Sequence, residues 1–178
     1  FTPPFHKDSP YYTRNQDSHA AEDVRRWWDY YRVRPGTGKR VSSGGVNIIF
    51  SDSNTHFRGH NNYRRSGDVD AMRLPKEGFY AHQVMWDGWV DVEPPGTHLI
   101  GHWNYAPGTV KDVLVVSSAE RVELKLDGRS LGFGTRSDGF LFTFPRITWA
   151  PGTIEAIGYD AKGRRVSADK RVTTGPPV

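Results

Sequence analysis

Two consecutive prolines followed by glycine, in the segment Val92-Glu93-Pro94-Pro95-Gly96, constrain the fold of this 178-residue chain more than any other feature. Proline fixes its own φ, donates no amide hydrogen and drives the preceding residue out of the helical region, so a helix cannot run through this segment. The hydrophobic pattern also differs on its two sides. We therefore predict two domains, residues 1–93 and residues 94–178, connected by an extended joint.

The first domain combines helix and strand patterns. Apolar residues at helical spacing predict a helix that Asp17 or Ser18 can cap and that stops at Pro35-Gly36. The nearly continuous apolar run Val46–Phe50 predicts a buried strand, and Pro75 suits the first position of a second helix. A single strand cannot hide both of its faces, so we interpret this domain as a fragment of an alternating α/β fold.

The second domain has strand patterns alone. Short runs rich in β-branched and aromatic residues predict strands at His98–Tyr105, Val110–Ser117, Arg121–Leu126, Phe140–Pro145, Thr153–Tyr159 and Arg164–Thr173. Asp127-Gly128 and Asp160–Gly163 predict tight turns. Six or seven strands in about 80 residues are typical of an immunoglobulin-like sandwich. Its predicted core includes Val113, Val115, Val122, Leu124, Phe142, Ile154 and Ile157.

Composition excludes several functional classes. The chain has no cysteine, which rules out disulfides, a thiolate nucleophile and a cysteine zinc site. No apolar run approaches the ~18 residues of a membrane-spanning helix, so we expect no membrane partner. The net charge of +4 is dispersed, with basic pairs such as Arg25-Arg26 but no longer basic run, so we expect no nucleic acid partner. Because residue 1 is Phe rather than Met, we expect the chain to begin inside a longer protein or to have been processed.

Three stretches of the second domain follow a recognisable pattern. The longest is Val113–Gly132, which contains Val122-Glu123-Leu124-Lys125-Leu126-Asp127-Gly128, and the others are Pro151–Asp160 and His98–Asn104. Together they resemble the immunoglobulin-like domain that follows the catalytic barrel in glycoside hydrolase family 2, the β-galactosidase-like enzymes.

The first domain is similar to the end of that family's barrel. Gly44-Gly45 resembles the start of the eighth barrel strand, and Ser66–Asp70 and Arg73–Tyr80 resemble the entrance to the last barrel helix. The resemblance covers nearly the whole chain. It implies the last strand and helices of a (β/α)8 barrel at 1–93 and an immunoglobulin-like β-sandwich at 94–178. It also implies that the chain is the C-terminal part of a longer retaining β-glycosidase, here called the parent enzyme.

The catalytic residues of the family have no counterpart in this chain. In the family the acid/base glutamate follows an asparagine near the fourth barrel strand, and the nucleophilic glutamate ends the seventh. This chain has no Asn-Glu pair, and its first glutamate, Glu22, lies inside the predicted helix. Ile48-Ile49 also stand where many members have aromatic or acidic residues. We therefore expect no catalytic residue here and no activity of the chain by itself.

The polar loop after the predicted strand is the candidate substrate site. In barrels such a loop lies at the catalytic face, and this one is rich in side chains that can hydrogen-bond sugar hydroxyls. The substrate-binding candidates are Asp52, Asn54, His56, Arg58 and Asn61. The alternative is that these groups satisfy one another and the loop backbone. In the same way, we favour Asp68 and Asp70 as turn caps that pair with nearby arginines.

We expect neither a metal nor a cofactor, since His56 and His60 have Gly59 and no glutamate between them. Three functions stay open. In the first, the chain is a piece of a glycosidase, with carbohydrate as substrate and the upstream remainder of the parent enzyme as partner. In the second, it is a non-catalytic carbohydrate-binding or scaffolding module. In the third, it is an adhesion-type sandwich with an unrelated N-terminal segment. The barrel motifs favour the first over the third. We favour a periplasmic or secreted parent over a cytoplasmic one.

Overall fold

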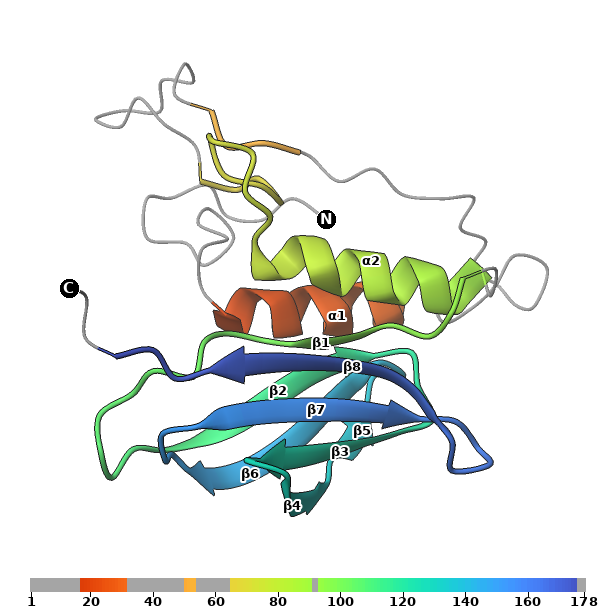
Figure 1. The fold of residues 1–178 in the computed structure, drawn as a ribbon. Helices are drawn as coiled ribbons and strands as arrows, with labels where there is room; N and C mark the ends of the chain where they lie inside the picture. The colour runs from red at the N-terminus through yellow and green to blue at the C-terminus, as the bar shows by residue number, and fades with distance from the viewer. Residues whose placement is uncertain (1–16, 32–49, 54–64, 91–92, 176–178) are drawn as a thin grey trace. The chain divides into compact units, whose positions relative to one another are not determined.

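The computed structural model describes residues 17–31, 50–53, 65–90 and 93–175 (Figure 1). In these ranges it contains two helices, α1 (Asp17–Tyr31) and α2 (Glu77–Val90), and eight strands. The chain forms two compact units, residues 1–82 and 83–178, and the division falls within α2. Within the described ranges, neither helix has the length and apolarity that crossing a membrane requires.

Both predicted helices are present. Asp17 lies in the first turn of α1, where a carboxylate stabilises the helix dipole, and the helix buries Ala20, Ala21 and Val24. The predicted end at Pro35-Gly36 lies outside the described residues, as does the predicted strand at 46–50 apart from Phe50. Helix α2 begins at Glu77, so the prediction that Pro75 takes the first position of this helix is wrong. Pro75 instead forms an isolated antiparallel bridge with Val69, two residues before the helix.

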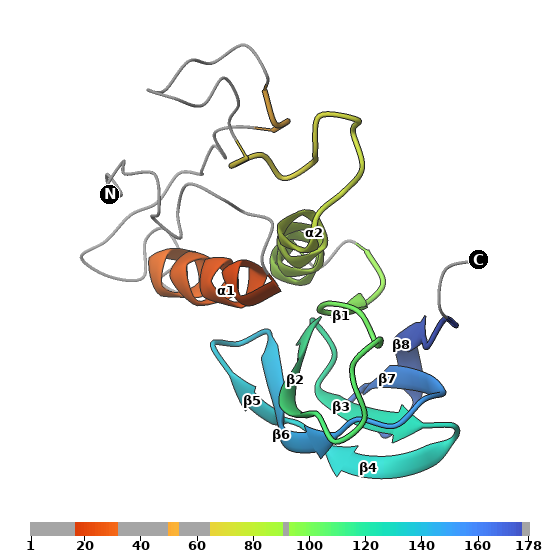
Figure 2. The ribbon, with the colours of Figure 1, turned by 90° about the vertical axis from the view of Figure 1, so that its left-hand side faces the viewer.

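The eight strands form two antiparallel sheets of four strands that face each other as a β-sandwich (Figure 2). The strand order is β1-β2-β6-β5 in one sheet and β4-β3-β7-β8 in the other. The bounds are β1 (Thr97–Leu99), β2 (Val110–Ser117), β3 (Arg121–Leu126), β4 (Arg129–Phe133), β5 (Thr135–Ser137), β6 (Leu141–Thr148), β7 (Thr153–Tyr159) and β8 (Arg165–Val172). The predicted sandwich is therefore confirmed.

Three strands differ from the prediction. Strand β1 ends at Leu99 instead of continuing to Tyr105, because Gly101 has a φ of 88° that takes the chain out of the extended conformation. Strands β4 and β5 were not expected, since most of their side chains are exposed and show no inside-outside alternation. They form by pairing with β3 and β6, respectively.

The predicted turn at Asp127-Gly128 joins β3 to β4. Both residues have positive φ, 48° and 80°, which is the conformation of a two-residue turn that matches the twist of the strands it connects. The predicted turn at 160–163 is also present. The amides of Lys162 and Arg164 both donate to Asp160 Oδ1 at 2.9 Å.

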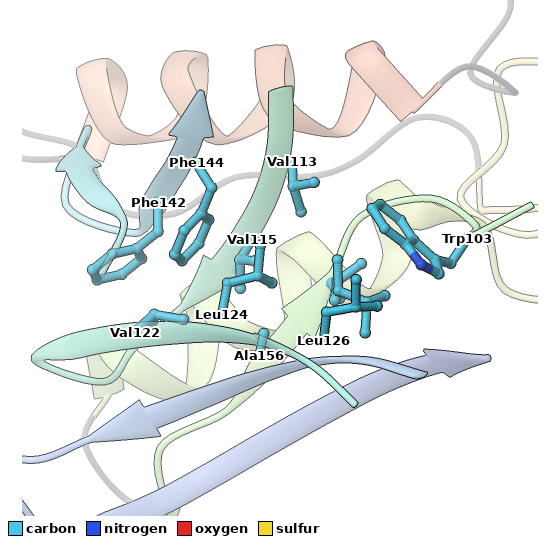
Figure 3. Packing of buried hydrophobic residues seen from close by; sticks show 11 residues of the cluster. Trp103, Val113, Val115, Val122, Leu124, Leu126, Phe142, Phe144 and Ala156 are labelled. Carbon is cyan, nitrogen blue, oxygen red and sulfur yellow. The ribbon is translucent and has the colours of Figure 1, made fainter. Parts of the chain in front are cut away.

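The core of the sandwich lies between the two sheets. Figure 3 shows side chains of β2 and β6, such as Val115 and Phe142, pointing toward Val122 and Leu124 of β3. All seven predicted core residues are buried. Ile154 and Ala156 of β7 belong to the core between the sheets, but Ile157 does not. Successive side chains of a strand point to opposite faces, so Ile157 is buried on the other face of β7.

The C-terminal half of α2 packs on the sandwich within the second unit. The ring of Trp89 meets the ring of Phe140 edge to face, with centroids 5.4 Å apart. Gly88 lies so close to the sandwich that an added Cβ would stand 2.5 Å from the Phe140 ring and 2.7 Å from Ser118 Cβ. A residue without a side chain therefore lets the helix approach this surface.

Two charged residues of β8 join the outer strands of the two sheets. Arg171 donates to the carbonyl oxygens of Leu99 (2.7 Å) and Gly101 (3.0 Å), and both carboxylate oxygens of Asp169 accept from Arg171 Nη1 at 2.8 Å. Asp169 also accepts from the Leu99 amide at 2.9 Å, and His98 Nδ1 lies 3.3 Å from it. Burial raises the pKa of Asp169, but these hydrogen bonds and the Arg171 charge outweigh it and lower the pKa from 3.8 to about 2.

Candidate functional site

The two ends of the polar loop are joined by main-chain hydrogen bonds. The Asp52 amide donates to the Val69 carbonyl and the Val69 amide donates to the Phe50 carbonyl, each at 3.0 Å. These bonds form a short parallel bridge between Ser51 and Val69, and Val69 is buried. The structure therefore describes the segment where the loop leaves, 50–53, and the segment where it returns, 65–70. We call these the outgoing and returning limbs.

Asp52 lies at the centre of this loop base. Its Oδ1 and Oδ2 accept from Lys76 Nζ at 2.7 and 2.8 Å, and Oδ1 also accepts from the Gly67 amide at 2.8 Å. The Asp52 and Lys76 side chains are each only 11% exposed. The carboxylate thus already accepts three hydrogen bonds from two protein donors, the Lys76 ammonium group and the Gly67 amide. Among the five predicted substrate-binding residues, Asp52 is the one that the structure describes, and Asn54, His56, Arg58 and Asn61 lie outside the described residues.

Glycine at position 67 is required by the close approach of the two limbs. An added Cβ would lie 2.4 Å from Asp52 N, 2.6 Å from Ser51 C and 2.7 Å from Val69 O. All three are main-chain atoms that cannot rotate away. Any other residue at this position would separate the limbs.

A tight turn follows the returning limb. Asp70 Oδ1 accepts from the amides of Met72 and Leu74 at 2.8 Å, and the Asp70 amide donates to the Leu74 carbonyl at 2.9 Å. Arg73 within this turn has a φ of 70°, in the left-handed region that non-glycine residues rarely adopt. Asp70 therefore caps a turn, as expected from the sequence.

Two histidines and two aspartates form a second cluster in the same unit. His82 Nδ1 lies 3.4 Å from Asp68 Oδ2, and His82 Nε2 lies 3.8 Å from Asp23 Oδ2. His19 Nε2 also lies 3.5 Å from Asp23 Oδ2, and all four side chains are at least 87% buried. The Trp27 ring stacks at a tilt on His82, with centroids 4.6 Å apart. This cluster ties α1, α2 and the returning limb together.

Neither cluster has the arrangement of a metal centre. Among the residues that the structure describes, no three or more His, Asp or Glu side chains are grouped so that they could hold a metal ion. The chemistry available at the loop base is hydrogen bonding between charged groups that are nearly enclosed by protein.

Comparisons with known proteins identify the family. Residues 108–167 match a family model described as a domain of unknown function (DUF4982). A β-glucuronidase of Formosa agariphila is 35% identical over 170 residues, 94% of this chain and 16% of that protein. A solved β-glucuronidase from glycoside hydrolase family 2 matches 99% of this chain and 18% of its own, with a TM-score of 0.73 and 31% identity. The chain belongs to glycoside hydrolase family 2.

Membership of family 2 confirms the resemblance carried by segments such as Val113–Gly132. The β-galactosidase BoGH2A of Bacteroides ovatus is also similar, at 30% identity over 113 residues, 63% of this chain and 13% of that protein. The chain spans less than a fifth of the length of each of these family 2 relatives.

Sequence reasoning missed Lys76 and the cluster around His82. Lys76 stands 24 residues after Asp52, so no local spacing connects the two. His19 and Asp23, in contrast, are four residues apart on the predicted helix, which places them on one face. The sequence could therefore have predicted the contact between His19 and Asp23. It could not have predicted the contacts of Asp68 and His82, which come from other elements.

Proposed function

We propose that this chain is the C-terminal part of a retaining β-glycosidase, with the end of a (β/α)8 barrel at 1–93 and an immunoglobulin-like sandwich at 94–178. One observation carries the proposal. Similarity to a family 2 β-glucuronidase extends over 99% of the chain, on both sides of Pro94-Pro95. An adhesion-type sandwich with an unrelated N-terminal segment would match on one side alone, so the match favours a piece of an enzyme.

The role proposed for the chain is to supply part of the sugar site. A retaining glycosidase needs one carboxylic acid that protonates the leaving oxygen and one carboxylate that attacks the anomeric carbon. No carboxylate here has the sequence motif for either task, so both come from the upstream remainder of the parent enzyme. The loop that Asp52 begins contributes hydrogen bonds to the carbohydrate substrate, through Asn54, His56, Arg58 and Asn61. Asp52 itself supports the base of that loop.

The first test compares this chain with the complete parent enzyme. Both are assayed against aryl β-glucuronides and aryl β-galactosides, and the anomeric configuration of the released sugar is followed by NMR. We expect the complete enzyme to hydrolyse one of these substrates with retention, and the 178-residue chain to hydrolyse neither. Activity in the chain itself, lost on substitution of Asp52 or Asp70, would show that the catalytic centre lies here. A complete protein that binds sugar without hydrolysing it would favour the carbohydrate-binding alternative.

The second test concerns the loop. In the complete enzyme, Asn54→Ala or His56→Ala should lower kcat/KM without unfolding the protein, because each lost hydrogen bond to the sugar removes about 1–3 kcal/mol. His102→Ala is the matched control, because His102 is an exposed histidine of the sandwich rather than of the loop. Its ring stacks on the Tyr105 ring, with centroids 4.4 Å apart. Wild-type kinetics in both loop variants would contradict the assignment.

A further inference from the structure

Lys76 contacts both limbs of the polar loop. Its ammonium group donates to the two carboxylate oxygens of Asp52 on the outgoing limb and to the carbonyl oxygen of Arg65 on the returning limb, at 2.7, 2.8 and 3.2 Å. Its own amide donates to the Asp68 carbonyl at 2.9 Å. Lys76 directly precedes α2, so the helix start, the outgoing limb and the returning limb meet at one side chain.

The donors of this lysine are fully used inside the protein. A lysine ammonium has three hydrogens, and the structure provides three acceptors for them. The side chain is also 89% buried. Lys76 is therefore placed to hold protein groups rather than to bind a sugar hydroxyl or an acidic sugar substituent.

We propose that Lys76 is a positioning residue, which tightens the contact between the two limbs at the base of the proposed sugar-binding loop and so supports sugar binding. This role rests on the proposed function of the loop. The physical reason is the cost of a nearly buried carboxylate without its cation. If Lys76 is removed, Asp52 keeps the Gly67 amide as donor but loses its counter-ion, and water must enter the loop base to hydrate it.

The effect of removing Lys76 should be local. The main-chain bonds between Asp52 and Val69 and between Val69 and Phe50 do not involve Lys76, so the limbs loosen without separating completely. The His82 cluster is also held by other side chains. We therefore expect a change at the Gly67 amide, which donates directly to the Asp52 carboxylate, and little change in α1 or in the sandwich.

The test uses three variants and one control. Lys76→Met removes the charge at similar length, Asp52→Asn removes its partner's charge, and Lys76→Arg keeps the charge and the donors. Lys162→Met is the control, because Lys162 is an exposed lysine in the turn between β7 and β8. Amide hydrogen exchange is measured on the 178-residue chain, and kcat and KM are measured on the complete enzyme.

For Lys76→Met and Asp52→Asn we expect amide hydrogen exchange to become about tenfold faster at Gly67 and to stay unchanged in α1 and β3. In the complete enzyme, both substitutions should raise KM about tenfold and change kcat less. Lys76→Arg should recover most of both effects, and Lys162→Met should match the wild type. The proposal is overturned if the Gly67 amide exchanges at the wild-type rate, if α1 and β3 lose protection equally, or if the kinetics do not change. If the unsubstituted complete enzyme cleaves no β-glycoside, the proposed function fails, and with it the role at a sugar site, whatever the exchange shows.

Discussion

Asp169 provides a sharp test of how the sandwich is held closed. The residue lies on β8 and reaches across to the main chain of β1, in the other sheet, together with Arg171. Replacing Asp169 by Asn keeps the shape of the side chain but removes its charge. We expect the free energy of unfolding of the sandwich at pH 7 to fall by about 2 kcal/mol.

The magnitude follows from the pKa. A carboxyl whose pKa is lowered from 3.8 to about 2 stabilises the folded state by about 2.5 kcal/mol when both states are ionised. The side chain is 23% exposed, and screening by solvent reduces this to about 2 kcal/mol. The folded chain binds a proton at this site less readily than the unfolded chain. The contribution is therefore complete above pH ~4, falls to about half near pH 3 and is nearly lost at pH 2.

The measurement is urea denaturation at several pH values, followed by the NMR signals of the Leu124 and Ile154 amides so that the sandwich alone is reported. The difference between wild type and Asp169→Asn should be about 2 kcal/mol at pH 7 and should shrink below pH 4. Glu120→Gln, which alters an exposed carboxylate 3.4 Å from Arg136, should have little effect. A difference that does not vary with pH, or no difference at pH 7, would refute the reasoning.

Two further substitutions test the packing of the sandwich. Leu124→Ala should destabilise it by about 2–5 kcal/mol in the same denaturation assay, because Leu124 is fully buried, and a loss below 1 kcal/mol would contradict its place in the core. Gly158→Ala should cost about 1–3 kcal/mol, because the added Cβ would lie 2.4 Å from Ser167 Oγ and 2.8 Å from Ala119 Cβ. Gly175→Ala, which meets nothing within 4 Å, is its control, and equal stability of the two variants would contradict the reasoning.

The sequence predicted the sandwich core well because a strand buried on one face must alternate. In β3, Val122, Leu124 and Leu126 are buried, and the residues between them are more exposed. The same logic fails for β4 and β5. The side chains of β5 are all exposed, and Gly132 and Gly134 interrupt the pattern, so these segments become strands only through their partners.

The loop base shows a different limit of sequence reasoning. The sequence predicts that Asp52 binds substrate, from its position after the predicted strand at 46–50. Its partners, Gly67 and Lys76, are 15 and 24 residues away and meet it only because the chain returns to the same place. Local spacing carries no information about such a return. Charge pairing between separate segments therefore has to be taken from the three-dimensional structure.

The outer strands of the sandwich also determine how readily it can pair with strands of other chains. Strands β1 and β5 have three residues each, and β4 has five, so they offer few main-chain groups to an incoming strand. The remaining outer strand, β8, is eight residues long, but it carries Arg165, Asp169, Lys170 and Arg171. Charges on an outer strand discourage intermolecular strand pairing, so these short or charged outer strands protect the sandwich against edge-to-edge aggregation.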